Sequence, residues 1–257
     1  MELIQSRDNL LIKEIKKLNE KKYRDALGKF FIEGYRFVEE AFLAGARVEK
    51  ILISQRYLER FEETVLSTYN VQRFLIKDNL FESLCGTETP QGVAAVIEKE
   101  KHEISFQKGT FVLLDRLQDP GNVGTIIRTS HAAGVRGIIY TTGTVDPYND
   151  KCLRSTMGSI FYIPIIEDKN LNLVNKLRDD GFKLVVSSLD TEEDFFSREY
   201  GDKIIIAVGN EGKGISKEVS ALADIKVKIP MPGGAESLNA SVAASIMIYE
   251  VLRQKIK

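Results

Sequence analysis

Five short segments with strand character recur along the C-terminal part of the chain, several of them nearly continuous apolar runs, separated by stretches with helical periodicity or turn residues. These segments are TFVLLD (110–115), GIIYT (137–141), KLVVSSL (183–189), IIIAVG (204–209) and DIKVKIP (224–230). Continuous apolar runs of this length are typical of parallel strands that are covered by helices on both faces. Residues 110–257 are therefore predicted to form an α/β domain around a parallel sheet.

The N-terminal part of the chain alternates helical and strand patterns on a smaller scale. Helices are predicted over residues 31–45, 56–68 and 79–85, and strands over residues 48–54, 71–77 and 92–98. This alternation predicts a small α/β domain over residues 1–98. The charged stretch 99–109 has no clear period and is predicted to be the linker between the two domains.

Composition limits the classes of function. The chain has 36 Lys and Arg against 37 Asp and Glu, so nucleic-acid binding would have to depend on local patches. The cysteines, Cys85 and Cys152, have no framework spacing, which favours a reducing, cytoplasmic compartment. Together with His102 and His131 they are too dispersed for a metal site. We expect no signal peptide and no membrane span, because charges are scattered through the N-terminus and apolar runs stay far below ~20 residues.

The first stretch that could carry chemistry is residues 113–135, where a strand ending at Asp115 leads through a Pro-Gly turn into a helix. Asn122 is predicted to be the N-cap of this helix. Arg128 lies near the apolar stripe in the second turn. It could be a surface arginine with an extended side chain, or a clamp for a phosphate or a ribose.

The second stretch, residues 204–216, carries a buried strand into a loop with three glycines and one carboxylate, Glu211. Ligands in open α/β sheets bind at such carboxyl ends of strands. The spacing does not fit a phosphate-binding Walker loop. The first strand of the domain also leads into no glycine fingerprint, which disfavours a nicotinamide cofactor.

The third stretch, residues 228–253, passes from a strand end through a Pro- and Gly-rich loop into a helix predicted to start at Ser237, its expected N-cap. Asn239 has no obvious packing role. The helix carries a face of Ala and Ser residues. Such a face could pack within the chain or against a second copy of it.

Together, these stretches resemble the three signature motifs of the SpoU family of RNA ribose 2′-O-methyltransferases, within the SPOUT superfamily. The matching residues are Asn122, Gly124 and Arg128 in the first motif, Gly209, Glu211 and Gly212 in the second, and Ile229, Pro230, Met231, Ser237, Leu238, Asn239 and Ser241 in the third. Residues 1–98 resemble the substrate-binding domain of the family. Ala240 departs from the pattern, because Val is common at that position.

The resemblance implies methyl transfer from S-adenosylmethionine to a ribose 2′-oxygen in RNA, a homodimer formed through the catalytic domain, and a deep trefoil knot. The two-domain form favours 23S rRNA as the substrate over tRNA. The family implies a catalytic group made of Arg128, Asn122, Glu211, Ser237 and Asn239. It implies cofactor contacts from Gly209, Glu211, Ile229, Met231 and Leu238.

Within that resemblance, Arg128 is the central catalytic residue, sometimes described as a general base. A guanidinium with a pKa above about 12 is a poor base. We therefore expect Arg128 to bind the 2′-oxygen or an adjacent phosphate and to stabilise negative charge. Glu211 is expected to orient Arg128 or groups near it.

A basic face near the N-terminus is the expected RNA contact. By itself, a charge run of this size favours a solvated helix face, and only the resemblance raises the RNA interpretation. The candidate contacts are Lys16, Lys17, Lys21, Arg36, Arg154 and Ser155, with the polar loop 86–92.

Two other functions stay open at this stage. One is a catalytically silent RNA-binding protein on the same scaffold, against which the intact Arg128, Glu211 and Asn239 argue. The other is a SPOUT enzyme that methylates a base, which the Asn and Arg of the first motif disfavour.

Overall fold

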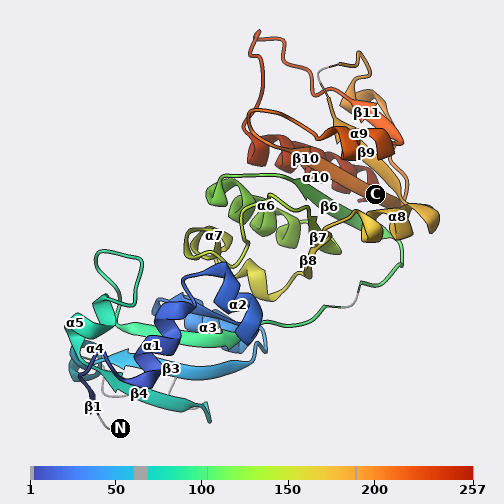
Figure 1. Ribbon diagram of the computed structural model, residues 1–257. Coiled ribbons are helices and arrows are strands. Elements are labelled where there is room, and N and C mark those ends of the chain that lie inside the picture. Colours follow the sequence, from blue (N-terminus) through green and yellow to red (C-terminus); the bar gives the residue numbers. More distant parts are fainter. Residues whose placement is uncertain (1–2, 61–68, 103, 189, 257) are drawn as a thin grey trace. The chain divides into compact units, whose positions relative to one another are not determined.

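The computed structural model describes residues 3–60, 69–102, 104–188 and 190–256, and the chain divides into two compact units (Figure 1). The first unit contains Met1–Lys101 together with Tyr148–Leu153. The second contains His102–Pro147 and Arg154–Lys257. Each unit has a sheet of its own with helices on both faces, as expected for α/β architecture.

The first unit is built on a mixed sheet with the order β1-β4-β3-β5-β2, in which β5 is antiparallel to both neighbours. Its strands are β1 (Leu3–Ile4), β2 (Lys29–Glu33), β3 (Val48–Ser54), β4 (Gln72–Ile76) and β5 (Val93–Glu98). Its helices are α1 (Leu10–Lys17), α2 (Lys21–Leu27), α3 (Tyr35–Leu43), α4 (Gln55–Arg60) and α5 (Asp78–Glu82).

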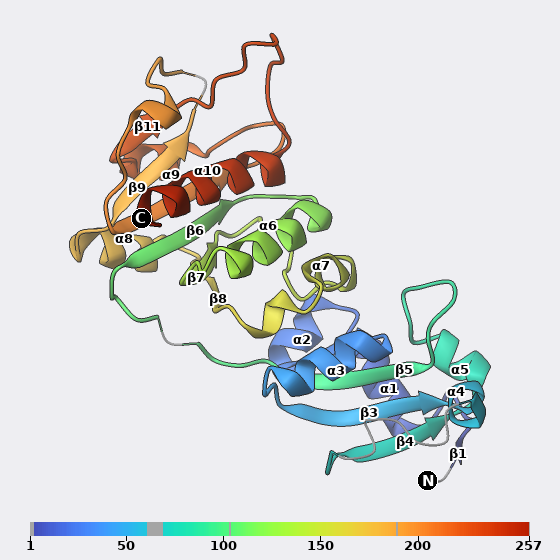
Figure 2. The ribbon, with the colours of Figure 1, turned by 180° about the vertical axis from the view of Figure 1, so that it is seen from behind.

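Helices cover both faces of this sheet. Ile12 and Ile15 of α1 and Phe81 of α5 share a core with Leu52 of β3. Helix α3 packs against β5 and β2. Figure 1 shows α1 in front of the sheet, and Figure 2, from behind, shows α3 in front.

The helix predicted over residues 31–45 is wrong at its start. Residues Lys29–Glu33 form β2, and α3 begins only at Tyr35. The alternate residues Phe30 and Ile32 of β2 are buried, and β2 pairs with β5. Gly34 has a φ of +103°, so the chain leaves the strand conformation here and the helix starts at the next residue. Of the helix predicted over residues 56–68, the structure has α4 as far as Arg60, and residues 61–68 lie outside the described residues.

The second unit contains a fully parallel sheet with the order β11-β9-β10-β6-β7-β8. Its strands are β6 (Gly109–Asp115), β7 (Gly137–Tyr140), β8 (Ile165–Glu167), β9 (Lys183–Ser187), β10 (Lys203–Gly209) and β11 (Ile225–Val227). Its α-helices are α6 (Pro120–Ala132), α8 (Asn172–Asp179), α9 (Lys217–Leu222) and α10 (Ala240–Lys255), and its short 3-10 helices are η2 (Ser159–Phe161) and η3 (Phe195–Ser197). Helix α7 (Asp150–Thr156) begins in the segment that belongs to the first unit.

Both faces of the parallel sheet are covered. Val174 and Leu177 of α8 and Val219 of α9 pack with alternate residues of β6, β9 and β10. Helices α6 and α10 pack against each other, and α10 also contacts β10, as both views show (Figures 1 and 2). The small-residue face of α10 is buried here within the chain, where Thr129 and Ser245 hydroxyls lie 3.2 Å apart.

The division of the chain differs from the predicted one in one segment. Residues 110–257 were expected to form a single domain, but Tyr148–Leu153 belong to the first unit. The Tyr148 ring lies 5.0 Å from that of Phe30, and the Lys99 ammonium lies 4.2 Å from the same tyrosine ring. A buried aromatic contact of this kind is not visible in sequence spacing.

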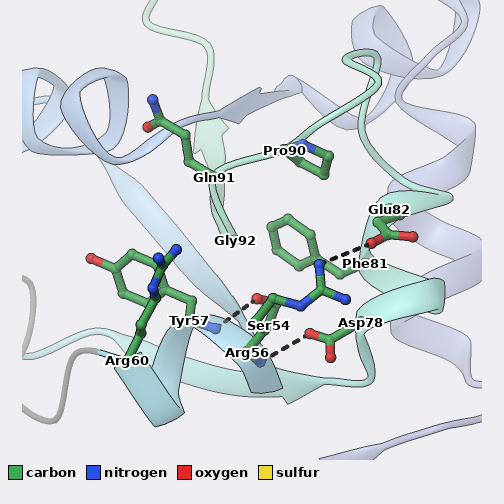
Figure 3. A pocket seen from close by; sticks show the side chains of 10 residues that line it. All are labelled: Ser54, Arg56, Tyr57, Arg60, Asp78, Phe81, Glu82, Pro90, Gln91 and Gly92. Atoms are coloured by element: carbon green, nitrogen blue, oxygen red, sulfur yellow. Dashed lines mark hydrogen bonds and ion pairs between the residues drawn. The ribbon is translucent and has the colours of Figure 1, made fainter.

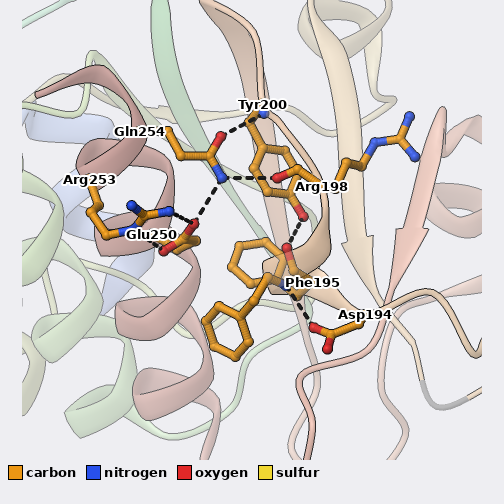
Figure 4. Close-up of polar contacts among 8 residues, drawn as sticks. Asp194, Phe195, Arg198, Tyr200, Glu250, Arg253 and Gln254 are labelled. Carbon is orange, nitrogen blue, oxygen red and sulfur yellow. Dashed lines mark hydrogen bonds and ion pairs between the residues drawn. The ribbon is translucent and has the colours of Figure 1, made fainter. Parts of the chain in front are cut away.

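The C-terminal half of α10 is fixed to the segment after β9 by polar contacts (Figure 4). Gln254 accepts a hydrogen bond from the backbone N–H of Tyr200 (2.8 Å) and donates to the carbonyl of Arg198 (2.9 Å) and to Glu250 (2.8 Å). Arg253 forms a two-pronged ion pair with the same Glu250. Every polar group of this cluster therefore has a partner inside the chain.

No described helix combines the length and the apolar character that crossing a bilayer requires. Among the same residues, no group of three or more His, Cys, Asp and Glu side chains is arranged to hold a metal ion.

Candidate active site

Strands β6 and β10 end side by side at one edge of the parallel sheet. In their register, Asp115 at the end of β6 lies opposite Gly209 at the end of β10. The chain order also reverses between these two strands, since β7 and β8 lie on one side of β6, and β10, β9 and β11 on the other. Such a switch point is where α/β sheets bind ligands.

The loop after β6 presents the N-terminus of α6. Asp119 is the N-cap, and its side chain accepts a hydrogen bond from the backbone N–H of Asn122 (2.9 Å). Asn122 was predicted to be the cap and instead lies in the first turn, with a buried side chain. Pro120 directly after Asp119 is the sequence signal that could have placed the cap correctly, because Pro is favoured at the first helical position.

The loop after β10 depends on a glycine at its first position. A Cβ built on Gly209 would lie 2.3 Å from the backbone carbon of Gly214, so the backbone of the loop would have to shift to admit it. The loop closes through paired backbone hydrogen bonds between Asn210 and Gly214 of 2.9 and 2.8 Å. The tight loop places Glu211 on the rim of the sheet edge.

The carboxylate of Glu211 joins this loop to α6. It accepts hydrogen bonds from the backbone N–H groups of Gln118 and Asp119, both 3.1 Å, and from the Asn122 amide (3.0 Å). Burial of the carboxylate raises its pKa, but these hydrogen bonds outweigh burial, so the pKa of Glu211 lies below its usual value. Glu211 is therefore held as an anion that fixes the start of α6.

The third stretch joins the same network through Asn239. The Asn239 amide donates to Asn122 Oδ1 (3.0 Å), and Asn239 Oδ1 accepts from the backbone and hydroxyl of Ser241 (2.9 and 2.7 Å). Asn239, not Ser237, is thus the N-cap of α10, which begins at Ala240. Glu211, Asn122 and Asn239 form one hydrogen-bonded chain across three segments that are far apart in sequence.

Arg128 lies on the solvent-facing side of α6. Thr125 and Ala132, which share its helical face, are also exposed. Among the described residues Arg128 has no hydrogen bond or ion pair, and the oxygens of Glu211 are bonded instead to Gln118, Asp119 and Asn122. Glu211 was expected to orient Arg128 or groups near it, and among the described residues its carboxylate contacts other residues at the start of α6 and not Arg128. An exposed, uncompensated guanidinium is available to an anion.

The predicted cofactor residues lie at the end of β10 (Gly209), just after β11 (Ile229) and in the stretch before α10 (Met231 and Leu238). Ile229 is buried, Met231 and Leu238 are half-buried, and Gly209 brings backbone close to backbone. Ser237 is exposed and has no hydrogen bond to a described residue. Apolar side chains beside close-approaching backbone suit a flat ring with edge groups that hydrogen-bond to main chain.

The predicted RNA contacts lie in both units. Lys16 and Lys17 are on α1, Lys21 on α2 and Arg36, which is exposed, on α3. Arg154 and Ser155 lie at the end of α7 in the second unit and interact with other residues of the chain.

Two neighbouring lysines are neutralised within the chain. Lys29 lies 2.6 Å and Lys50 2.8 Å from Glu49, and Glu14 lies within 4 Å of both ammonium groups. These two lysines therefore add little net positive charge to the surface of the first unit.

A buried carboxylate that the sequence analysis did not single out supports the sheet edge. Asp115 accepts hydrogen bonds from the Thr141 hydroxyl (3.0 Å) and from the backbone N–H of Ser216 (2.6 Å), and it is 1% exposed. It holds the loops after β7 and β10 to the end of β6. Its position as the last residue of an apolar strand was the available signal.

Known proteins match both units of the chain. The SpoU rRNA Methylase family matches residues 109–249, and the MRM3-like substrate binding domain matches residues 9–95. The 23S rRNA (guanosine(2553)-2′-O)-methyltransferase RlmP of Bacillus subtilis is 35% identical over 98% of this chain and 99% of its own length.

Solved structures agree with this match. The AdoMet-bound rRNA methyltransferase from Sinorhizobium meliloti has a TM-score of 0.87 and 30% identity, covering 100% of this chain and 99% of its own. The SpoU methyltransferase AviRb from Streptomyces viridochromogenes, in complex with the cofactor AdoMet, has a TM-score of 0.87 and 29% identity, covering 97% and 99%. The motif residues and these full-length matches agree: the chain belongs to the SpoU rRNA methylase family.

Proposed function

We propose that this protein transfers a methyl group from S-adenosylmethionine to the 2′-oxygen of one ribose in 23S rRNA, in the cytoplasm. The observation that carries the proposal is the hydrogen-bonded chain Glu211–Asn122–Asn239, which ties the three motifs together at the edge where β6 and β10 end. Beside it, Arg128 is exposed and has no partner among the described residues.

The residues around the strand ends fit the cofactor. S-adenosylmethionine, when bound, supplies an electrophilic methyl group on its sulfonium. Gly209 lets backbone approach closely, and Ile229, Met231 and Leu238 offer apolar contact for the adenine ring. Because the Gly209 position is crowded by the backbone of Gly214 in its own loop, the apolar side chains are what support a cofactor site here.

The polar residues divide into two roles. Asn122, Glu211 and Asn239 spend their side-chain hydrogen bonds on one another and on helix N-termini, so they act as positioning residues. Arg128 and Ser237 have no such partner among the described residues and are left to contact RNA. Arg128 would bind the ribose 2′-oxygen or a neighbouring phosphate and stabilise negative charge on the bound oxygen.

The first unit is proposed to hold the RNA. Lys16, Lys17 and Lys21 provide a basic edge, and Arg36 adds an exposed cation. Replacing the three lysines with alanine is expected to weaken RNA binding and to flatten its salt dependence, because each lost phosphate contact lowers the slope by about 0.7–0.9. Lys13→Ala serves as a single-charge control on the same helix, where Lys13 forms an ion pair with Asp8 at 2.7 Å. Unchanged affinity and slope in the triple variant would leave this edge as a solvated surface.

The homodimer is also a proposal. Val242 and Tyr249 lie on one face of α10 and are 46% and 49% exposed, which gives an apolar stripe suited to a second copy of the chain. The double variant Val242→Glu with Tyr249→Glu is expected to sediment as a monomer. If it sediments as the native protein does, this stripe is not the interface.

We further propose that the second unit contains the deep trefoil knot that the family implies, with the C-terminal segment threaded through a preceding loop. Backbone tracing in an experimental density map tests the knot directly.

Methylation of RNA by the purified protein tests the function. The protein is incubated with radiolabelled S-adenosylmethionine and with rRNA or tRNA from cells that lack the gene, and the label is mapped after alkaline hydrolysis. Labelled, alkali-resistant dinucleotides from 23S rRNA are expected. The nucleotide that corresponds to the guanosine named for the B. subtilis enzyme is the first to map.

Each other outcome would indicate a different function. Label in single nucleotides would indicate methylation of a base, and label only in tRNA would indicate that the substrate is tRNA and not rRNA. Cofactor binding without transfer to any RNA, or no cofactor binding at all, would favour the silent RNA-binding protein.

A further inference from the structure

The first unit contains a pocket far from the motif residues in sequence. It lies at the C-terminal end of β3 (Figure 3), between α4, α5 and the loop that enters β5. Its volume is about 210 Å³, below the roughly 300–1,000 Å³ of sites for whole drug-sized ligands. Its lining comprises Ser54, Arg56, Tyr57, Arg60, Asp78, Phe81, Glu82, Pro90, Gln91 and Gly92.

The backbone of this pocket requires a glycine. Gly92 has a φ of +91°, and an added Cβ would lie 2.6 Å from Ser54 Oγ and 2.7 Å from Tyr57 Cβ. The backbone N–H of Ser54 donates to the Gly92 carbonyl (2.8 Å), and the N–H of Tyr57 donates to Ser54 Oγ (3.2 Å). These contacts hold the loop against the start of α4 and fix the backbone position of Tyr57.

The pocket combines aromatic rings with planar cations. Phe81 is 1% exposed and forms an apolar floor, and Tyr57 is half-buried. The guanidinium groups of Arg56 and Arg60 line the same space, as the sticks of Figure 3 show. Nucleobases that leave their stack bind to aromatic rings and arginine planes of this kind.

The cations are available for a ligand. Arg60 is exposed and has no hydrogen bond or ion pair with a described residue. Arg56 lies 3.8 Å from Glu82 with both side chains largely exposed, and such a pair contributes little. Gln91 accepts from the backbone N–H of Tyr35 (2.9 Å), so its amide nitrogen is left without a partner among the described residues.

The carboxylates limit what can enter. Asp78 and Glu82 line the pocket, and Asp78 already accepts a hydrogen bond from the backbone N–H of Arg56 (3.0 Å). Two anions disfavour a phosphate inside the pocket but accept hydrogen bonds from the amino groups of a base. The arrangement therefore suits a base inside and its phosphate at the arginines on the rim.

We propose that this pocket receives a single unpaired nucleotide of the RNA substrate, with its base against Tyr57 and Phe81 and its phosphate beside Arg56 and Arg60. The proposal rests on the proposed function, because it takes RNA to be the ligand of the first unit. On this proposal, the first unit recognises the shape of the RNA. It positions the substrate by binding a nucleotide other than the one that is methylated.

Binding of two short RNA hairpins tests the pocket without any turnover. One hairpin carries a single-nucleotide bulge and the other is fully paired, and both carry a fluorescent label for anisotropy. The native protein is expected to prefer the bulged hairpin by about tenfold, as stacking of one base on aromatic side chains would give. Arg56→Ala, Arg60→Ala and Tyr57→Leu are each expected to lose most of this preference.

Arg47→Ala is the matched control. Arg47 is an arginine of the same unit, loosely paired with Glu98 at 3.8 Å, and it precedes the start of β3 whereas the pocket lies at its end. Its loss removes the same charge and is expected to leave the preference intact. Arg60→Lys keeps the charge but not the plane and is expected to fall between the native protein and Arg60→Ala.

Methylation kinetics give a second measurement. The pocket variants are expected to raise KM for rRNA severalfold while kcat, cofactor affinity and melting temperature stay at native values. Equal losses in Arg47→Ala, or no bulge preference in the native protein, would overturn the pocket. The proposal would also be overturned if the pocket variants bound RNA as the native protein does but bound ribosomal particles more weakly. That result would indicate that the pocket binds a protein. Failure of native methylation would instead overturn the proposed function, and the hairpin result would still decide the pocket.

Discussion

The two ends of α10 carry polar networks of similar density but different character. At the N-terminal end, Asn239 connects to Asn122 and Glu211 at the edge of the sheet. At the C-terminal end, Gln254 and Glu250 bind the segment after β9 (Figure 4). Both ends contain a carboxylate with a lowered pKa.

The arginines beside these networks differ. Arg253 forms two hydrogen bonds of 2.7 and 2.8 Å to Glu250, and these raise the pKa of Arg253. Arg128 has no such partner among the described residues. A dense network therefore does not by itself mark a site. The C-terminal network joins α10 to the segment after β9, whereas the N-terminal network joins three motif segments, in which Arg128 and Ser237 have no partner among the described residues.

The largest effect is expected from removing the unpaired arginine. Arg128→Ala should lower kcat/KM for RNA by about 100-fold or more, the usual cost of losing a group that stabilises transition-state charge. Cofactor binding by calorimetry and the melting temperature should stay native. Arg253→Ala, the same substitution in the other network, should keep turnover. Native turnover by Arg128→Ala would remove the distinction between the two arginines.

The loop that carries Glu211 can be broken without touching a polar group. Gly209→Ala should cost about 3 kcal/mol of unfolding free energy because the new methyl meets backbone, and it should abolish cofactor binding. Gly214 in the same loop has a φ of +67°, but an added Cβ would meet no atom within 4 Å. Gly214→Ala should therefore lower the unfolding free energy by only about 1 kcal/mol. Urea denaturation measures both. Equal costs would mean that the close approach at Gly209 is not what the loop requires.

The C-terminal network should act on stability alone. Gln254→Ala removes three hydrogen bonds and should lower the unfolding free energy by about 1–2 kcal/mol, with unchanged activity per folded molecule. Gln72→Ala is the matched control, because the exposed side chain of Gln72 on β4 has no hydrogen bond to a described residue, and it should change little. A loss of kcat in Gln254→Ala at full folding would show that the two ends of α10 are coupled.

The smallest effect concerns pH. The pKa of Glu211 in the folded protein lies below its ordinary 4.5, so its ionised form adds stability above that pH, and the contribution is lost as pH falls through the folded value. Glu211→Gln should therefore be less stable than the native protein at neutral pH, by less than about 1 kcal/mol for an exposed carboxylate. The difference should vanish in acid. If the difference in unfolding free energy between the two proteins were the same at every pH, the effect would come from the shape of the side chain and not from its charge.

Local sequence signals were reliable where local physics decides the outcome. The apolar runs of β6, β7, β9 and β10 predicted buried parallel strands, because strands covered on both faces have no polar side. Helix starts were less reliable. Ser237 was a plausible cap, yet Asn239 caps α10, and Asp119 rather than Asn122 caps α6. Several residues of each stretch can cap a helix, and tertiary contacts select one.

The prediction of where α3 begins was wrong for a related reason. Residues 31–45 have helix-forming composition, but Phe30 and Ile32 gain more by pairing with β5 across the sheet. That pairing joins Phe30 to Ile97, far along the chain, and helical periodicity within a window cannot report it.

The sequence by itself identified the motifs: which residues form them, that a glycine-rich loop follows an apolar strand, and that Arg128 is a candidate clamp for a ribose or a phosphate. Tertiary structure alone decided how these residues act. Asn122 meets Glu211 across 89 residues and Asn239 across 117, because the strand order places the end of β6 next to the end of β10. The pocket around Tyr57 arises in the same way, from a strand end, two helices and a loop that only the packed sheet brings together.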